Sequence, residues 1–317
     1  MKSAISYYNF VHEEEPETIR PISDKAKKLL EVYSKDVLNG KRLEEALILS
    51  ELLQHREAEV SAFLDSLRIN YRLESNPQTV MAACNSLNLR FMREKSNNKL
   101  VPVSILLELE LIACENSRMR LLPDFEQLLQ EAEFERFLLD LMHHSKQAFL
   151  SDFNPDQHQD GFVLYRKYTR SDVFRLLRWE ENPVAQNVGG YIISQDKSNC
   201  PIFVTYHKSE DIAPTTQYED RFLSPSVMEW FSKKNRNLSS PDVRYLQSLA
   251  PTRRLPLFVQ KNNDEGIKFY YLGNVEPRPN TFVQESMPNS NTPVVKLHFD
   301  LNSPVEDSLY TYLTDTG

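Results

Sequence analysis

The chain has 317 residues, of which 40% are hydrophobic and 26% charged, and its formal net charge is −8. This length and composition are typical of a soluble globular protein with two domains. No run of about 18 apolar residues occurs and the N-terminus has no signal-peptide core, so we expect no membrane contact and a cytoplasmic location. Cys84, Cys114 and Cys200 form no CxxC pair, which argues against a disulfide framework and a structural zinc site.

The first half of the chain has the apolar periodicity of helices. Residues 1–22 are acidic and contain proline, so we expect a flexible tail. From Ser23, which can cap a helix, helical spacing predicts helices over 23–40, 41–68, 79–91, 101–113 and from Pro123 onward. The run SILLELELIA within 101–113 is apolar on nearly every side, which predicts a buried helix. We therefore predict an all-helical domain over residues 23–150.

The pattern changes after a polar stretch at residues 151–160. Residues 161–317 contain apolar runs typical of strands: FVLYRKY, YIIS, PIFVTYH, LPLFVQ, KFYYL and PVVKLHFDL. YIIS with PIFVTYH and LPLFVQ with KFYYL are predicted as hairpins, and a closing helix is predicted over Val305 to Leu313. Because no βαβ rhythm is present, residues 161–317 are predicted to form an α+β domain with a curved sheet or a partly closed barrel.

Residues 200–236 carry the densest group of side chains suited to binding. They are predicted to form a strand, a polar loop and a helix that carries Trp230 and Phe231. The basic residues Lys233, Lys234 and Arg236 follow that helix. Aromatic rings, carboxylates and cations in one stretch suit recognition of a nucleobase and its phosphates. The alternative is a strand and a helix packed in an ordinary core, with a solvated loop between them.

Catalytic motifs with a known mechanism are absent from the sequence. The chain has no GxxxxGK[ST] phosphate-binding loop, no HExxH and no GxSxG. We therefore assign no catalytic residue, no metal ligand and no cofactor to it. Two alternatives to nucleic-acid recognition remain open: a metal-dependent nuclease that uses His207, Glu210 and Asp211, and a protein-interaction module whose helical half docks a partner.

Several segments of the second half resemble a known bacterial family. In chain order they are GFVLYRKYTRSDVFRLLRWE, CPIFVTYHKSED, YEDRF, WFSKKNR, FYYLGNVEP and FDLNSPVEDSLYTYL. They resemble the C-terminal domain of unknown function of bacterial superfamily II helicase-like proteins, from about Gly161 to Leu313. Among these proteins are the SauUSI-type restriction enzymes, which join a phospholipase D-like nuclease, an ATP-driven translocase, a helical coupler and a target-recognition domain. They cut DNA that carries 5-methylcytosine or 5-hydroxymethylcytosine.

The resemblance implies that residues 23–150 are the coupler and residues 161–317 the DNA target-recognition domain. The implied partner is double-stranded DNA with a modified cytosine, which would be flipped out of the duplex to be read. This chain lacks the helicase and nuclease motors, so we expect these from a parent protein or a partner chain. By analogy, the pattern of sheet and helices suits a PUA-like barrel, the fold of SET-and-RING-associated (SRA) methylcytosine readers.

The implied base pocket needs aromatic faces, a carboxylate that accepts a hydrogen bond from the cytosine amino group, and an apolar site for the 5-methyl group. The candidate base-binding residues are Tyr206, Tyr218, Asp220, Phe222, Trp230 and Asp211. The candidate DNA-backbone residues are Lys208, Arg221, Lys233, Lys234, Arg236, Arg166, Lys167 and Arg170. Because the net charge is negative, we expect modest affinity when the chain acts alone.

Overall fold

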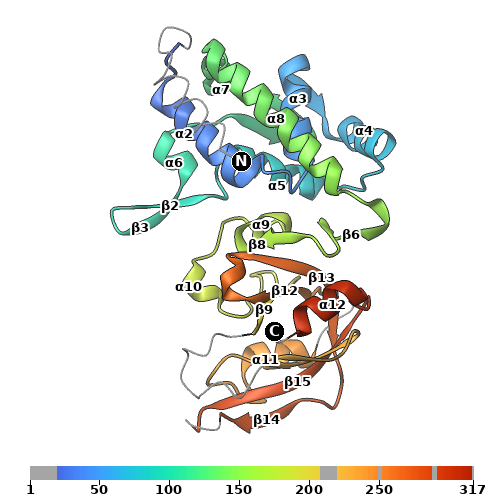
Figure 1. Ribbon diagram of the computed structural model, residues 1–317. Coiled ribbons are helices and arrows are strands. Elements are labelled where there is room, and N and C mark those ends of the chain that lie inside the picture. Colours follow the sequence, from blue (N-terminus) through green and yellow to red (C-terminus); the bar gives the residue numbers. More distant parts are fainter. Residues whose placement is uncertain (1–19, 208–219, 249–251, 288–290, 316–317) are drawn as a thin grey trace. The chain divides into compact units, whose positions relative to one another are not determined.

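The computed structural model describes residues 20–207, 220–248, 252–287 and 291–315. It confirms the predicted α+β fold with a curled sheet (Figure 1). The chain divides into two compact units. The helical unit comprises Met1–Gly161 and Phe174–Asn182, and the sheet unit comprises Phe162–Val173 and Pro183–Gly317.

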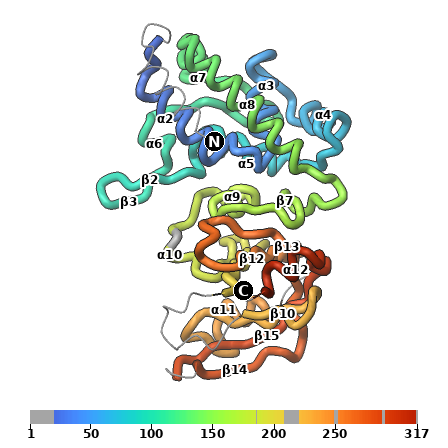
Figure 2. The backbone as a smooth tube through the Cα atoms, viewed as in Figure 1, coloured from blue at the N-terminus to red at the C-terminus, as the bar shows by residue number. Residues whose placement is uncertain are grey.

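The helical unit is built mainly from α-helices and a few short strands. Its helices are α2 (Asp24–Val32), α3 (Glu44–His55), α4 (Val60–Tyr71), α5 (Pro77–Leu87), α6 (Val103–Leu107), α7 (Pro123–Leu128) and α8 (Ala132–Asp152), with a π-helical turn at Tyr33–Val37 and a 3-10 turn at Pro155–Gln157. Its strands are β1 (Glu57–Glu59), β2 (Arg93–Ser96), β3 (Lys99–Pro102), β4 (Ile112–Glu115), β5 (Arg118–Leu121) and β6 (His158–Gln159). Helix α8 packs along α2 and α3, and the β2–β3 hairpin extends away from these helices (Figure 2).

The unit is therefore helix-rich, but it is not all-helical as predicted. The prediction of one buried helix over residues 101–113 is wrong, because this stretch forms β3, the short α6 and β4. Helix α6 ends where Glu108 adopts the left-handed conformation, with φ of 50°. The side chain of Asn88 then hydrogen-bonds the backbone of Leu111 and Ile112, which satisfies the extended chain that follows. A short apolar run has no periodicity that separates a strand from a helix, which explains the error.

A group of buried charges stabilises the helical unit. Glu45 of α3 is 0% exposed, and its Oε1 accepts hydrogen bonds from Arg42 Nε at 2.7 Å and from Arg175 Nη1. Arg175 is 1% exposed and also donates to the side chain of Asn39. Residues 174–182 are thus held in the helical unit by a buried cation, although they follow the first strands of the sheet unit in sequence.

The sheet unit contains one large sheet with short helices. Its strands are β7 (Phe162–Val163), β8 (Lys167–Thr169), β9 (Ile202–His207), β10 (Arg221–Ser224), β11 (Val227–Phe231), β12 (Pro256–Asn262), β13 (Lys268–Pro277), β14 (Val283–Ser286) and β15 (Pro293–Leu301). Its helices are α10 (Ala185–Val188), α11 (Pro241–Gln247) and α12 (Asp307–Thr314), with a 3-10 turn at Asn263–Glu265; α9 (Arg170–Leu176) begins in this unit and ends in the helical one. The strand order is β10-β11-β15-β13-β12-β9, β14 also pairs with β15, and β8 also pairs with β13.

Strand β13 curls the sheet. Its first residues pair with β8 and β12, and its last residues, Val275 to Pro277, pair with β15. The register against β12 shifts between Pro256 and Phe258, opposite the position where Gly273 has φ of 89°. A glycine with positive φ at a β-bulge lets a strand bend sharply, so β13 can serve both parts of the sheet.

Aromatic side chains join the two edge strands of the curled sheet, β9 and β10. The ring of Tyr206 on β9 stacks on Phe222 of β10 with centroids 5.5 Å apart, and its hydroxyl accepts from the Phe222 N–H at 3.3 Å. Tyr191, which forms a bridge with Ile202 of β9, packs edge-on against Trp230 of β11 at 5.1 Å. The core is therefore continuous across the open side of the half-barrel.

The strand assignments of the second half are partly confirmed. The β12–β13 hairpin, the alternating strand β15 and the closing helix α12 are present, and α12 lies against β12 (Figure 1). Residues 191–194 form no strand, but an antiparallel bridge joins Tyr191 to Ile202 and the Ser194 N–H donates to the Asn199 carbonyl, so the predicted first hairpin is present only as a short bridged turn. FVLYRKY is split into β7 and β8, because Tyr165 has φ of 64°.

The predicted helix carrying Trp230 and Phe231 is wrong, since these residues lie on strand β11. Met228 and Trp230 point into the core and pair with Phe299 and Leu297 of β15. Two apolar residues two positions apart fit the period of a strand, and the pairing with β15 supplies the hydrogen bonds. Consequently Lys233, Lys234 and Arg236 follow a strand, not the C-terminal end of a helix.

We predict that Arg175→Ala lowers the free energy of unfolding by about 2–3 kcal/mol, because it removes one of the two arginines that hydrogen-bond the fully buried Glu45 and leaves Arg42 to compensate that charge. Urea denaturation followed by circular dichroism measures this loss. The matched control is Arg68→Ala, which removes an exposed pair with Asp65 and should cost at most about 1 kcal/mol. Equal, small effects of the two variants would contradict the role assigned to Arg175.

Candidate functional site

The sheet unit contains a basic pocket with a volume of about 760 Å³. It lies between residues 191–197, the segment that follows β11, and helix α11 with the chain beyond it. The cationic side chains that line it are Lys197, Lys233, Arg236, Arg244 and Arg253. Asp242 is the one carboxylate among the described lining residues, and Tyr191 and Tyr245 supply aromatic rings. We call this site the basic pocket.

Hydrogen bonds to β15 hold the segment that follows β11. The Ser232 N–H donates to the carbonyl of Val295, and the Ser232 hydroxyl accepts from the Val295 N–H, both at 2.9 Å. The Arg236 N–H donates to the carbonyl of Pro293 at 3.1 Å. Lys233 and Arg236 are therefore carried by backbone that is tied to the sheet at both ends.

Gly189 makes room for Lys233. It follows α10 with φ of 55°, a conformation that favours glycine. A Cβ atom at this position would lie 3.1 Å from Cε of Lys233, closer than side chains normally pack. Gly189 thus allows its backbone to approach the side chain of Lys233. The sequence does not reveal this role, because the two residues are distant along the chain.

Tyr191, Asp242 and Arg236 form a hydrogen-bonded group on one side of the basic pocket. Oδ2 of Asp242 accepts from the Tyr191 hydroxyl at 2.6 Å and from Arg236 Nε at 2.7 Å. Burial and the hydrogen bond to Asp242 raise the pKa of Tyr191, so its hydroxyl stays a donor. Burial works against ionisation of Asp242, but the hydrogen bonds from Tyr191 and Arg236 prevail and lower its pKa. The carboxylate is therefore charged and fixes the direction of Arg236.

Two cations of the pocket lie over aromatic rings. Nζ of Lys233 is 4.8 Å from the ring centroid of Tyr191, and the Arg253 guanidinium carbon is 5.0 Å from that of Tyr245. Burial, together with repulsion from Arg236, lowers the pKa of Lys233. An anion in the pocket would relieve this repulsion, because an opposite charge nearby favours the charged form of a lysine. The arrangement is chemically suited to bind a phosphate-type anion.

Trp230 and Phe222, two of the predicted base-binding residues, are core residues. Trp230 is 2% exposed and packs between Tyr191 and Phe299, and Phe222 is 8% exposed and packs between Tyr206 and Tyr310. Neither ring offers a face to a base in this structure, so the prediction that they stack on one does not fit their burial. The strands that bury these rings, β10 and β11, are too short to show a clear period in the sequence, so the sequence does not reveal their core position.

The other predicted base-binding residues divide into two groups. Tyr206 is half-buried at the end of β9, and Oδ1 of Asp220 accepts from the Phe231 N–H at 2.9 Å. Tyr218 and Asp211 lie outside the described residues, as does the predicted backbone cation Lys208. Tyr206 lies near the C-terminal end of β9, and Asp220 directly precedes β10. Neither residue lines the basic pocket.

Of the predicted backbone cations, Lys233 and Arg236 line the basic pocket. The others that the structure describes lie elsewhere in the sheet unit. Arg221 pairs with Glu229 at 2.8 Å, and Lys167 pairs with Glu265 at 3.3 Å. Arg170 packs over the rings of Phe203 and Phe269, and burial lowers its pKa. Arg166 and Lys234 are exposed.

Sequence reasoning missed Tyr191, Lys197 and Asp242 in this pocket. Tyr191 lies in the run YIIS, which predicts a strand, and Lys197 has no distinguishing neighbour in the sequence. Asp242 follows Pro241 at the start of α11, where an acidic residue is common for reasons of helix stability alone. These residues become candidates for binding only because the fold places them around one pocket with Lys233.

The described residues include no group of three or more His, Cys, Asp or Glu side chains placed to hold a metal ion. Nε2 of His207 lies 3.0 Å from the carbonyl oxygen of Leu313, and Glu210 and Asp211 are outside the described residues. Within the described part of the chain, no helix combines the length and apolar character needed to cross a bilayer.

Comparison with known protein families finds two matches, each to a part of the chain. Residues 162–313 match the family described as a domain of unknown function (DUF3427). Residues 1–151 match a second family described as a domain of unknown function (DUF8090). No curated protein matches the chain significantly.

We predict that Asp242→Asn destabilises the protein near neutral pH and that the difference from the wild type shrinks as the pH falls below about 4. The pKa of Asp242 is lowered in the folded state, so its contribution to stability is present above the unfolded-state pKa and is lost on protonation. Urea denaturation between neutral and acidic pH measures the effect. Asp264→Asn, at an exposed turn, is the matched control and should give a small difference at every pH. A penalty for Asp242→Asn that is independent of pH would contradict the prediction.

Proposed function

We propose that the sheet unit is a DNA target-recognition domain that binds the phosphate backbone of duplex DNA through the basic pocket. In this proposal it acts in the cytoplasm as part of an ATP-dependent, modification-dependent restriction enzyme that reads 5-methylcytosine or 5-hydroxymethylcytosine. The observation that carries the DNA-binding part is the meeting of Lys197, Lys233, Arg236, Arg244 and Arg253 around a pocket of about 760 Å³.

Several properties of the basic pocket suit a phosphate ligand. Lysine and arginine dominate contacts of proteins with phosphates, and the arginine fork matches two phosphate oxygens. Arg236 is held in a fixed direction by Asp242, so less conformational entropy is lost when it binds. The tyrosine rings lie beneath two of the cations and support their positions. Five cations against one carboxylate leave an excess of positive charge to be neutralised by a ligand.

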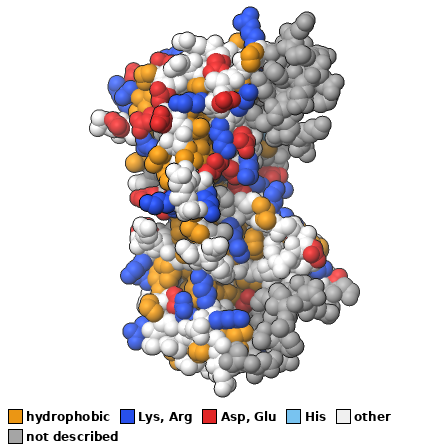
Figure 3. All heavy atoms as spheres, turned by 90° about the vertical axis from the view of Figure 1, so that its left-hand side faces the viewer, with side chains coloured by type: hydrophobic (Ala, Val, Ile, Leu, Met, Phe, Trp, Pro, Cys, Tyr) orange, Lys and Arg blue, Asp and Glu red, His pale blue; other side chains and the backbone are white. Residues whose placement is uncertain are grey.

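The whole chain has a net charge of −8, which limits the affinity of the chain alone. On the face shown in Figure 3, Lys and Arg side chains lie dispersed among apolar and acidic ones. Binding through a local pocket on such a surface should depend strongly on salt, because it rests on release of counterions from DNA. A parent protein or partner that supplies the helicase and nuclease motors would add further contacts.

The modified-base part of the proposal is supported by the sequence resemblance and by the curled sheet, which is of the general kind used by PUA-like readers. A flipped cytosine needs an aromatic face and a carboxylate acceptor. With Trp230 and Phe222 in the core, these roles pass to Tyr206 or Tyr218 and to Asp220 or Asp211. Among the described candidates, Tyr206 is the aromatic residue that is only half-buried.

We predict that the double variant Lys233→Ala, Arg244→Ala weakens binding of methylated and plain duplexes alike. Phosphate contacts carry no sequence information, and the slope of log K against log salt should become shallower by about 0.9 per lost contact. Both changes leave the Tyr191–Asp242–Arg236 group intact. Fluorescence anisotropy over a series of salt concentrations measures affinity and slope.

The matched control for this experiment is the double variant Lys261→Ala, Lys268→Ala. It removes the same charge from the same unit at positions that do not line the basic pocket. The proposal requires the pocket variant to lose clearly more affinity than the control. If the two variants weaken binding equally, the effect is one of net charge and the pocket is not the DNA site.

We predict that the chain binds a duplex with 5-methylcytosine more tightly than the same unmodified duplex. Tyr206→Ala should remove about 1–3 kcal/mol of this binding if its ring stacks on the flipped base. The control is Tyr310→Ala, because Tyr310 also packs on Phe222, edge-on at the same centroid distance of 5.5 Å, and reports the effect of losing a ring from this cluster. Equal affinity for methylated and plain duplexes at all salt concentrations, or equal effects of the two tyrosine variants, would refute base recognition by Tyr206.

A further inference from the structure

Two cysteines that are thirty positions apart in the sequence (114 − 84 = 30) meet in the helical unit. Cys84 lies on α5 and is buried, and Cys114 lies on β4 and is half-buried. Asn88 explains their meeting. It ends α5 and accepts from the backbone N–H groups of Leu111 and Ile112 at 2.9 Å, while its amide donates to the Ile112 carbonyl at 2.7 Å.

The spacing of these residues directs both thiols to the same place. Cys84 precedes Asn88 by four residues, so the two side chains share one face of the helix. Cys114 follows Ile112 by two residues, so both lie on the same face of the strand. Helix α5 packs against β4, and a side-chain hydrogen bond joins the two cysteines, with the thiol of Cys84 as the donor.

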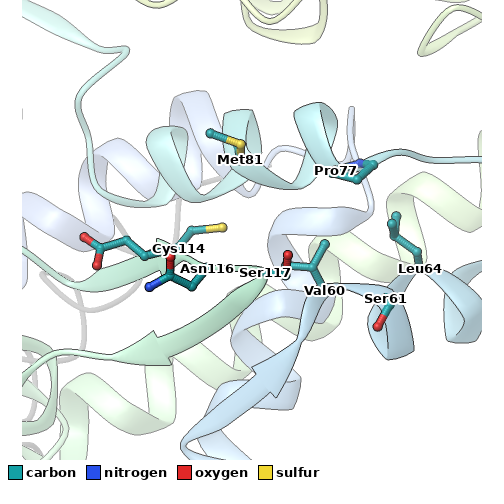
Figure 4. Close-up of a pocket in the computed structure, with 9 residues that line it drawn as sticks. Val60, Ser61, Leu64, Pro77, Met81, Cys114, Asn116 and Ser117 are labelled. Atoms are coloured by element: carbon teal, nitrogen blue, oxygen red, sulfur yellow. The ribbon is translucent and has the colours of Figure 1, made fainter.

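Cys114 is also accessible, because it lines a pocket of about 560 Å³ within the helical unit. Figure 4 shows Cys114 beneath the helix that carries Met81 and Pro77, with Asn116 and Ser117 of the β4–β5 turn beside it. A small solute can therefore reach the sulfur of Cys114 from the pocket, while Cys84 lies behind it in the core.

The two thiols differ in acidity in a way that separates their roles. The hydrogen bond from Cys84 lowers the pKa of Cys114 to about 7, against the opposing effect of burial. The same hydrogen bond, with burial, raises the pKa of Cys84. Since the thiolate is the nucleophile, Cys114 is the sulfur that reacts first with an electrophile.

We propose that Cys84 and Cys114 form a peroxide-sensitive dithiol site, in which Cys114 is the attacking thiol and Cys84 the resolving thiol. The Cys114 thiolate attacks one oxygen of hydrogen peroxide, the O–O bond breaks, and the sulfenic acid of Cys114 and, after protonation, one water molecule are formed. The sulfur of Cys84 then displaces the hydroxyl group of that sulfenic acid, and its thiol proton leaves with this group as a second water. Two thiols and one peroxide thus give one disulfide and two waters.

The disulfide would join α5 to β4 by a covalent bond. To form this bond the two sulfurs must approach to about 2.05 Å. A link between positions 84 and 114 constrains the unfolded chain, so the oxidised protein should unfold at a higher temperature than the reduced one. The pocket would at the same time lose its reactive sulfur.

The full chain, reduced and freed of reductant, is treated with hydrogen peroxide near pH 7.5, and unreacted thiols are alkylated in denaturant. Peptide mapping by mass spectrometry is expected to find one disulfide, Cys84–Cys114, with the loss of two hydrogens, and to find Cys200 alkylated. Cys200 is an internal control, because burial raises its pKa to about 12. Alkylation of both Cys84 and Cys114 after peroxide treatment, or oxidation of Cys200 at the same rate, overturns the proposal.

Two variants separate the roles of the thiols. In Cys84→Ser, Cys114 should stop at the sulfenic acid, which a cyclic 1,3-dione traps; in Cys114→Ser, Cys84 should remain reduced. Trapping at Cys84 in place of Cys114 would overturn the assignment. The mapping of the wild-type chain decides the existence of the disulfide without either variant, so a variant that folds poorly does not remove the test.

Discussion

The sheet unit depends on the bending of β13. This strand pairs with β8 and β12 along its first part and with β15 along its last, and the positive φ of Gly273 lies where the register against β12 shifts. The bend turns an open sheet into a half-barrel, and it brings the ends of the strand order, β9 and β10, toward each other. A flat sheet of this length would hold those strands far apart, since neighbouring strands are about 4.8 Å apart.

The closing of this half-barrel explains the use of its aromatic residues. Tyr206 stacks on Phe222 between β9 and β10, and Tyr191 packs on Trp230 between β9 and β11. Large rings fill the gap that backbone hydrogen bonds do not close, and they bury much apolar area for each residue. Tyr191 then has its hydroxyl directed to Asp242, at the rim of the core. Tyr191 therefore links the closed core of the half-barrel to the basic pocket, which both Tyr191 and Asp242 line.

The sequence predicted those features that depend on local periodicity. Strand β15 alternates over nine residues, so the run PVVKLHFDL is recognisable as a strand, and the β12–β13 hairpin is marked by a turn rich in Asn, Asp and Gly. It failed for Trp230, because five residues of β11 are too few to distinguish a strand from a helix, and the pairing that decides comes from β15, more than sixty residues later. Tyr191, Asp242 and the Cys84–Cys114 pair are unpredictable for the same reason, since each acquires its role only through a partner that is distant in the sequence.

The charges of the basic pocket show how an acidic chain can hold a cationic site. Each buried cation loses hydration, and neighbouring cations repel one another, so such a cluster is costly unless something compensates it. Asp242 compensates Arg236 through a direct hydrogen bond, whereas Lys233 lies over a ring face and burial lowers its pKa despite the attraction of Asp242. The carboxylate is thus sufficient to hold the group together without neutralising it. The remaining positive charge is what an anionic ligand would bind, and the same ligand would return Lys233 toward its ordinary acidity.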